Sequence, residues 1–361
     1  MRDDSKLIPH VFMKGSFREM GSQYGEAMAS EIAFQNDWWT KALAAHWPNM
    51  DMERALNAAK TMYAPAVELY APRWADFIEG MAEGAGLPYD DVLWINVASN
   101  LLEGPAMAMR MVAGGCTDIG VQPDKTDIGK LIIGQNLDWH PELKPVCLHF
   151  DPADAPKALA FTISGALPQF GISENGYGSF GNALGTEENK TGVTMNALTA
   201  ELLFQDCIGS ACERITMADR SMCFNHMLGA ADGTLIDFET TPSSFGVLLP
   251  EEKGWIAHTN HYITSWMQKD DTFKTFPDTF VRLSWAEKFL RDADVITVDT
   301  LKKIFSDHHG DKTRSLCTHP VPGASFTECW QTVYSMISIP EDGVIYATTQ
   351  PCEHEYEEYR L

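Results

Sequence analysis

The segment Gly114-Gly115-Cys116-Thr117-Asp118 places a nucleophile after a backbone that can adopt unusual angles. Two glycines before a cysteine relax the steric limits on the chain and leave the carbonyl carbon of Gly115 open to attack. The Cys116 thiol could attack this carbonyl and form a thioester, which water would hydrolyse. The new chain would begin at Cys116, and its α-amine, with an intrinsic pKa of about 7.7–8.0, could act as general base for the thiol. The competing interpretation is a small buried hydrophobic residue.

Three further polar residues could complete such a site. Asp138 ends the second strand of a predicted hairpin whose first strand begins at Cys116, so it could orient the amine or the thiol. Asn182 and Asn260 lie where predicted strands meet loops. Their amide N–H₂ groups are neutral donors suited to an oxyanion. We take Cys116, Asp138, Asn182 and Asn260 as candidate catalytic residues, although a carboxylate at a strand end and asparagines in turns are also common structural features.

Histidines and cysteines near the C-terminal end suggest a second kind of site. His308, His309, Cys317 and His319 cluster in the sequence, and His258 and His261 are three residues apart. Zinc sites usually carry a C-x-x-C pair or an H-E-x-x-H helix, and neither motif is present. The ligand types are nevertheless present, so a metal-dependent hydrolase that uses the 308–319 cluster is an alternative function. The cysteine chemistry requires no metal and no organic cofactor.

Two other motifs have structural interpretations. Residues 176–181 match G-x-G-x-x-G, but the residues that follow predict a strand and a turn where a dinucleotide site needs a helix. We expect these glycines to serve strand turns or close backbone contacts. Asn189-Lys190-Thr191 matches a glycosylation sequon, which we interpret as a polar turn.

The expected elements are helical at first and then largely strands. Apolar spacings of three and four predict helices over 17–39 and 52–84 and a third helix that begins at Asp90. A loop follows near residue 105, and Asp232-Gly233 predicts a hairpin turn. Strands are predicted over 117–121, 131–136, 146–150, 158–164, 177–184, 222–228, 234–240, 255–260 and 332–348, and helices return over 195–218 and 280–306. This order predicts an α+β layered fold with antiparallel sheet.

Composition narrows the function classes. Of 361 residues, 27 are Lys or Arg and 50 are Asp or Glu, so the net charge is −23. Such a surface repels phosphate backbones and anionic lipid, which disfavours nucleic-acid and membrane partners. The N-terminus lacks the apolar stretch of a signal peptide, and the eight cysteines are too dilute for a disulfide scaffold. We expect a reduced, cytoplasmic protein.

The candidate residues and their neighbours resemble the acyl-coenzyme A:6-aminopenicillanic acid acyltransferase family, the autoproteolytic C45 group of N-terminal nucleophile hydrolases. The resemblance covers nearly the whole chain and depends on the order and spacing of its motifs. These are Met20-Gly21-Ser22-Gln23-Tyr24-Gly25-Glu26, 79–87, Trp94-Ile95-Asn96, Gly115-Cys116-Thr117, 134–139, His258-Thr259-Asn260-His261-Tyr262 and Pro351-Cys352-Glu353.

The resemblance implies a four-layer αββα sandwich, made as a precursor and cut between Gly115 and Cys116. Residues 1–115 would form a helical N-terminal segment and 116–361 the hydrolase core, together in one compact unit. Cys116 would be the nucleophile, Asp138 its acidic partner and Asn260 the oxyanion donor, with Asn182 carried over from the related choloylglycine hydrolases. Those relatives have arginine where Gln135 stands here, which argues against bile-salt chemistry in detail.

The implied activity is that of a cysteine amidohydrolase or acyltransferase. It would take a small-molecule acyl donor, an amide or a thioester, and pass the acyl group to water or an amine. A homo-oligomer is possible. Family members also use an arginine in the C-terminal part, for which Arg314 is the candidate. A chain of the same fold that has lost catalysis and acts as a binding protein is a further alternative.

Overall fold

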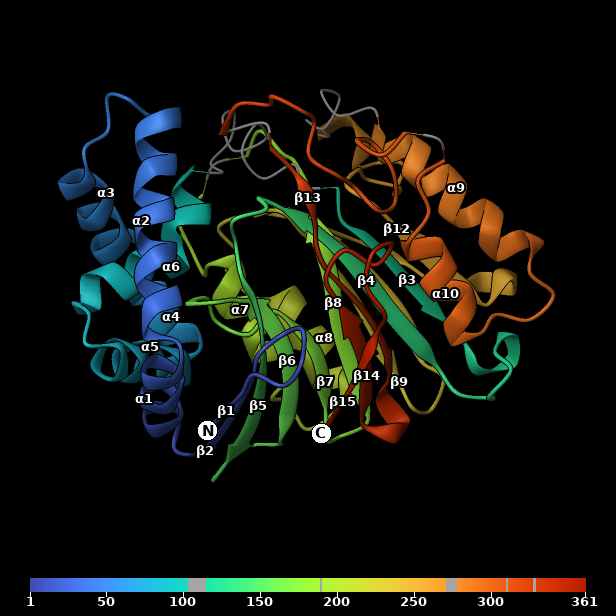
Figure 1. The fold of residues 1–361 in the computed structure, drawn as a ribbon, viewed down its shortest axis with the longest axis horizontal. Helices are drawn as coiled ribbons and strands as arrows, with labels where there is room; N and C mark the ends of the chain where they lie inside the picture. The colour runs from blue at the N-terminus through green and yellow to red at the C-terminus, as the bar shows by residue number, and fades with distance from the viewer. Residues whose placement is uncertain (103–114, 189, 271–277, 310, 327–328) are drawn as a thin grey trace.

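Two β-sheets lie face to face, with helices on both outer sides (Figure 1). The computed structural model describes residues 1–361 apart from 103–114, 189, 271–277, 310 and 327–328. Gly114, the loop predicted near residue 105 and Asn189 of the sequon lie outside the described residues.

The first sheet has nine described strands in the order β1-β2-β5-β6-β7-β8-β9-β10-β11. Neighbours in it are antiparallel except β2 and β5, which pair in parallel. Its strands are β1 (Arg2–Asp3), β2 (His10–Gly15), β5 (Pro145–Pro152), β6 (Ala158–Ile163), β7 (Phe170–Ser173), β8 (Tyr177–Ala183), β9 (Phe224–Ala230), β10 (Leu235–Thr240) and β11 (Phe245–Leu248).

The second sheet has six described strands, all antiparallel, in the order β12-β3-β4-β13-β14-β15. They are β3 (Thr117–Val121), β4 (Ile132–Trp139), β12 (Trp255–His258), β13 (Gln331–Ile339), β14 (Val344–Thr348) and β15 (Glu357–Arg360). Strand β4 is buried along its whole length because one face contacts β8 of the first sheet and the other contacts helix α10. A strand covered on both faces has no solvent side, so its apolar residues need not alternate with polar ones.

The helices cover the two sheets from outside (Figure 1). On the side of the first sheet are eight described helices, of which α1 and α8 contact its strands and α2, α3 and α4 pack mainly on other helices. They are α1 (Phe17–Ala27), α2 (Ala29–His46), α3 (Met52–Ala58), α4 (Ala64–Tyr70), α5 (Pro72–Ala85), α6 (Tyr89–Leu102), α7 (Met195–Leu202) and α8 (Ile208–Met217). On the second lie α9 (Asp278–Asp292) and α10 (Val298–Phe305). The expected α+β fold with αββα layers is therefore confirmed. Among the described residues, no helix combines the length and apolar character needed to cross a bilayer.

The structure differs from the sequence prediction at the N-terminal end. The first hundred residues are not all helical, since β1 and β2 join the first sheet. The predicted helix over 52–84 is divided into α3, a π-helical turn at Ala59–Tyr63, α4 and α5. Prolines at the starts of α4 and α5 explain the division, because proline suits the first turn of a helix and disrupts its interior.

Other predicted features are confirmed. The glycines of 176–181 lie in a turn and in β8, with Gly176 at a φ of +76°, and the strand continues to Ala183 where a dinucleotide site would need a helix. The Asp232-Gly233 turn joins β9 to β10, as predicted.

Helices α1 and α5 cross with their backbones in contact. A Cβ atom on Gly80 would lie 2.0 Å from the carbonyl oxygen of Arg18, and one on Gly21 would lie 2.1 Å from that of Phe77. Gly25 and Gly84 have equally close neighbours across the crossing. Two of the motifs that carried the family resemblance, 20–26 and 79–87, therefore meet through their glycines.

We expect Gly80→Ala to destabilise the chain by about 3 kcal/mol, because the added methyl group overlaps the backbone of α1. Urea unfolding measures the change. Gly209→Ala in α8 is the control: its Cβ would lie 3.7 Å from the sulfur of Cys207, an ordinary contact, so stability should change by at most about 1 kcal/mol. Equal stability of the two variants would contradict the close crossing.

Candidate active site

Cys116 stands at the start of β3, between the two sheets. Strands β3 and β4 pair with Thr117 opposite Asn136, so Cys116 lies beside the end of β4 that carries Asp138. The predicted hairpin is thus confirmed. Burial and the nearby carboxylates of Asp138 and Asp118 raise the pKa of the Cys116 thiol to about 12, while Arg282 lowers it. The sulfur is therefore a thiol at neutral pH.

The carboxyl group of Asp138 has one bonded and one free oxygen. Its Oδ1 accepts a 2.6 Å hydrogen bond from the hydroxyl of Thr332 on β13, whereas Oδ2 has no hydrogen-bond partner among the described residues. Burial raises the pKa of Asp138 to about 7, against the lowering effects of Arg282, Thr332 and Thr318. A carboxyl group that titrates near neutral pH can both accept and donate a proton.

Arg282 of α9, which the sequence analysis missed, contacts the peptide bond between Gly115 and Cys116, the Gly115–Cys116 junction. Its Nη1 donates to the carbonyl oxygens of Gly115 and Cys116, both at 2.7 Å, and to the hydroxyl of Thr117 at 3.2 Å. Its Nε faces the Asp278 carboxylate at 3.3 Å. The side chain is buried, and α9 showed no sequence signal that distinguished this arginine from the others.

Arg314 was the candidate arginine from the sequence, and its role stays a prediction. It is exposed, and the charge near it is that of Asp311. Arg282, in contrast, donates to both carbonyls of the Gly115–Cys116 peptide segment.

Gly115 is confined between the acid and the arginine. A Cβ atom at this position would lie 2.8 Å from Oδ2 of Asp138 and 3.0 Å from Cζ of Arg282. A larger residue would push one of these groups aside. Glycine is therefore required here by close approach, and the free oxygen of Asp138 lies against the Gly115–Cys116 junction.

Both candidate asparagines are oriented by a cation. Arg282 Nη2 donates to Oδ1 of Asn260 at 2.9 Å, so Nδ2 of Asn260 is left as donor and bonds the carbonyl of Ala183 at 2.9 Å. In the same way Oδ1 of Asn182 lies 3.2 Å from Nδ1 of His258, and Nδ2 of Asn182 donates to the carbonyl of Thr259. An amide N–H₂ carries two hydrogens, so each asparagine can make one more donation.

A charged layer lies behind Asn182, between the sheets. His258 Nε2 contacts Glu239 Oε1 at 2.9 Å, with Asp237 and Asp118 nearby, and all four side chains are fully buried. Burial by itself would lower the pKa of His258, but Asp237 and Glu239 raise it to about 9. His258 is therefore an imidazolium at neutral pH, with both ring nitrogens as donors, and this fixes the amide orientation of Asn182.

A mostly apolar cavity opens at the Cys116 sulfur. Cys116, Asp138 and Asn182 share its wall with apolar side chains from β4, β7, β8, α7 and β9, namely Leu137, Trp139, Phe170, Ala183, Met195 and Phe224. The cavity has a volume of about 30 Å³, so a group larger than a water molecule would fit only if the wall side chains moved. Cys116 lines this cavity although the residue as a whole is buried, with 8% of its surface exposed.

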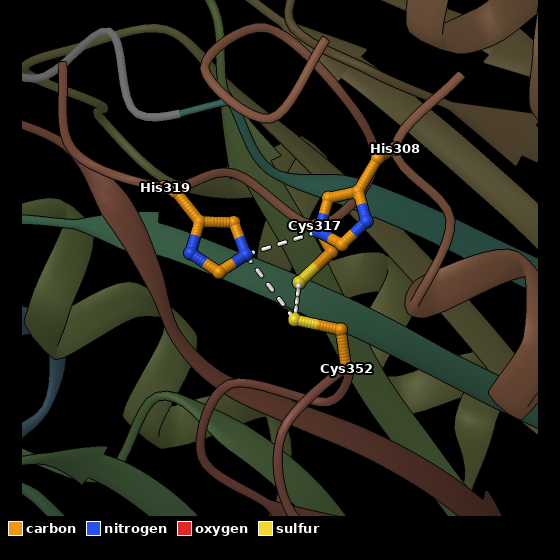
Figure 2. Close-up of side chains that lie close together, drawn as sticks. All are labelled: His308, Cys317, His319 and Cys352. Carbon is orange, nitrogen blue, oxygen red and sulfur yellow. Dashed lines mark hydrogen bonds between the residues drawn. The ribbon is translucent and has the colours of Figure 1, made fainter. Parts of the chain in front are cut away.

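The 308–319 cluster gains a member that the sequence analysis did not include. His308, Cys317 and His319 meet Cys352, and their ligand atoms lie within 4.8 Å of one another (Figure 2). His309 instead bonds Asp307. His258 and His261 are engaged with Glu239 and Thr279, so this pair does not converge on a metal site.

The chain is similar in structure to two kinds of solved hydrolase. No protein-family model matches the chain, and a search of curated proteins finds no match. Among solved structures, two variants of the conjugated bile acid hydrolase from Clostridium perfringens share 14% and 15% identity with TM-scores of 0.44 and 0.42, covering 68% of this chain and 97% of theirs. Penicillin V acylase from Agrobacterium tumefaciens shares 8% identity at a TM-score of 0.44, covering 65% of this chain and 83% of its own.

These likenesses, all below a TM-score of 0.5, fix neither a family nor an activity. Any assignment of function to this chain therefore depends on the contacts around Cys116.

The pKa of Asp138 predicts a pH dependence of stability. Because the folded chain raises this pKa from 3.8 to about 7, it holds a proton that the unfolded chain releases, so stability falls as pH rises from about 4 to about 7. The substitution Asp138→Asn is made in a Cys116→Ala background. It should reduce the decrease in unfolding free energy between about pH 4 and pH 7 by up to roughly 4 kcal/mol. Urea unfolding at several pH values measures it. The exposed Asp127→Asn is the control, and an unchanged slope in Asp138→Asn would contradict the buried acid.

Proposed function

We propose that this chain is an autoprocessed cysteine amidohydrolase or acyltransferase, cut between Gly115 and Cys116. The observation that carries the proposal is the hydrogen bond from the buried Arg282 guanidinium to the carbonyl oxygen of Gly115, directly before a cysteine and against the free oxygen of Asp138. A carbonyl that accepts from a cation is polarised for attack, and the same donor stabilises the oxyanion that forms.

Autocleavage is proposed to proceed in two steps. The Cys116 sulfur attacks the Gly115 carbonyl carbon while Arg282 holds the developing oxyanion, and collapse breaks the C–N bond to give a thioester. The proton lost by the thiol passes through Oδ2 of Asp138 to the departing nitrogen, which becomes the α-amine of Cys116. Water then cleaves the thioester, leaving a carboxylate on Gly115 and a free thiol on Cys116.

The processed site is proposed to repeat this chemistry on a substrate. The new α-amine of Cys116 takes the thiol proton, and the ammonium group that forms next to the sulfur stabilises the thiolate against the burial that raises the thiol pKa. The thiolate attacks the acyl carbon of an amide or thioester donor, and the remaining amide hydrogens of Asn260 and Asn182 stabilise the oxyanion. The leaving group receives the proton, and water or an amine then takes the acyl group from sulfur.

The cavity favours a small-molecule donor with an apolar acyl group. Apart from the polar side chains of the site and Gln169, its wall is apolar or aromatic. Burying apolar acyl surface there contributes about 0.8 kcal/mol per methylene group.

A metal-dependent hydrolase and a binding protein without catalysis are the other candidates. Four protein ligands would fill the coordination of a tetrahedral metal at the 308–319 cluster, whereas a catalytic metal needs an open position. A binding protein requires neither a polarised Gly115 carbonyl nor an unpaired acid oxygen beside it. Both features therefore favour the cysteine enzyme.

Denaturing mass spectrometry of purified protein tests the cut. We expect two chains, the larger beginning at Cys116, and an intact chain for Cys116→Ala. Arg282→Gln should slow cleavage about 100-fold or more, because it removes the donor on the Gly115 carbonyl. The exposed Arg314→Gln is the matched control and should be cut normally. An intact, inactive wild-type chain would overturn the proposal.

The cavity wall predicts a change in acyl preference. Met195→Ala should enlarge the apolar cavity and raise the kcat/KM ratio of a longer over a shorter acyl chain about 10-fold. A series of N-acyl amino acids of increasing chain length measures it. Met217→Ala, at a methionine that is 76% exposed, should leave the ratio unchanged. If both variants keep the wild-type ratio, this cavity does not hold the acyl group.

A further inference from the structure

Four metal-binding side chains from two distant segments meet at one point. His308, Cys317 and His319 come from the connection between α10 and β13, and Cys352 follows β14 (Figure 2). His308 Nε2 lies 3.0 Å from His319 Nε2, the sulfurs of Cys317 and Cys352 lie 3.2 Å apart, and His319 Nε2 lies 3.2 Å from the Cys352 sulfur.

We infer that these four residues form a structural zinc site. Zinc in structural sites is tetrahedral, with bonds of about 2.3 Å to sulfur and about 2.0–2.1 Å to nitrogen, so its ligand atoms lie about 3.3–3.8 Å apart. Three separations in the cluster are 3.0–3.2 Å, and all four ligand atoms lie within 4.8 Å of one another. The two sulfurs are about 0.6 Å closer than a zinc ion would hold them, so binding would require the side chains to move by several tenths of an ångström. Two cysteines and two histidines are also a donor set that zinc takes in closed sites.

The surroundings fit a divalent cation. Two thiolates would neutralise the charge of the ion, and Glu353 lies next to one ligand. Its carboxylate oxygen is 3.9 Å from Nδ1 of His319, the ring nitrogen that does not face the other ligands. At 3.9 Å this carboxylate is a nearby negative charge and not a hydrogen-bond partner, and a charge there favours a cation bound to the imidazole.

All four coordination positions would be filled by the protein, so the ion would hold structure and not activate water. It would tie the connection before β13 to the segment after β14. Thr318, between two of the ligands, exchanges hydrogen bonds with Thr332, whose hydroxyl donates to Asp138. The zinc site would thus fix the wall behind the acid of the candidate active site.

Metal analysis of the intact protein, purified without chelators under reducing conditions, tests the inference. We expect one zinc per chain in the wild type and loss of zinc in Cys352→Ser and His308→Ala. The matched controls, Cys212→Ser and the exposed His354→Ala, should keep the metal. Glu353→Gln should weaken zinc binding about 10-fold.

Cobalt provides a measurement on the folded wild type. Co²⁺ added to the zinc-depleted protein should give visible absorption of a tetrahedral site with thiolate ligands, and added zinc should abolish it. A wild type that binds neither metal, or that contains a Cys317–Cys352 disulfide when isolated under reduction, would overturn the inference. Cys116→Ala should be uncut and inactive yet hold a full equivalent of zinc, so failure of the zinc site and failure of the proposed function are distinguishable.

Discussion

The buried charge of Arg282 constrains the structure around Cys116 more than any other interaction described. Taking a guanidinium out of water is costly, and the cost is offset because its nitrogens meet oxygens of Gly115, Cys116, Thr117, Asn260 and Asp278. These oxygens belong to three segments of the chain. Moving α9 or the start of β3 would leave a buried cation without partners, so the arginine fixes the backbone at which the proposed chemistry begins.

The buried guanidinium of Arg282 explains the types of the residues that surround it. The cation and Asp138 approach Gly115 so closely that a Cβ atom does not fit without displacing one of them. Asn260 accepts from the same guanidinium, which leaves its N–H₂ as donor. Glycine, asparagine and aspartate at these positions thus follow from one packing arrangement around one charge.

The N-terminal segment is part of the sandwich and not an appendage to it. Strand β2 pairs with β5 over six residues, and α1 crosses α5 in backbone contact. Under the proposed processing, cleavage at Gly115 would therefore leave residues 1–115 bound through sheet and helix contacts. The expectation of an all-helical N-terminal segment missed β1 and β2 because these short strands lack a clear alternating pattern and their partner β5 lies more than 130 residues away.

The sequence could predict contacts between residues that are close along the chain, and it could not predict contacts between distant segments. The hairpin that brings Cys116 to Asp138 is local, and its strands and turn are encoded within about two dozen residues. Arg282 and Cys352 could not be found in this way, because each reaches its site from a segment whose own pattern indicates only an ordinary helix or loop. Their side chains acquire a role through packing between distant elements. Thr318 and Thr332 show the same dependence: unremarkable in sequence, they connect the four-ligand cluster to Asp138. A change in that cluster would therefore alter the pKa of Asp138, because this pKa depends on the hydroxyl groups of Thr318 and Thr332.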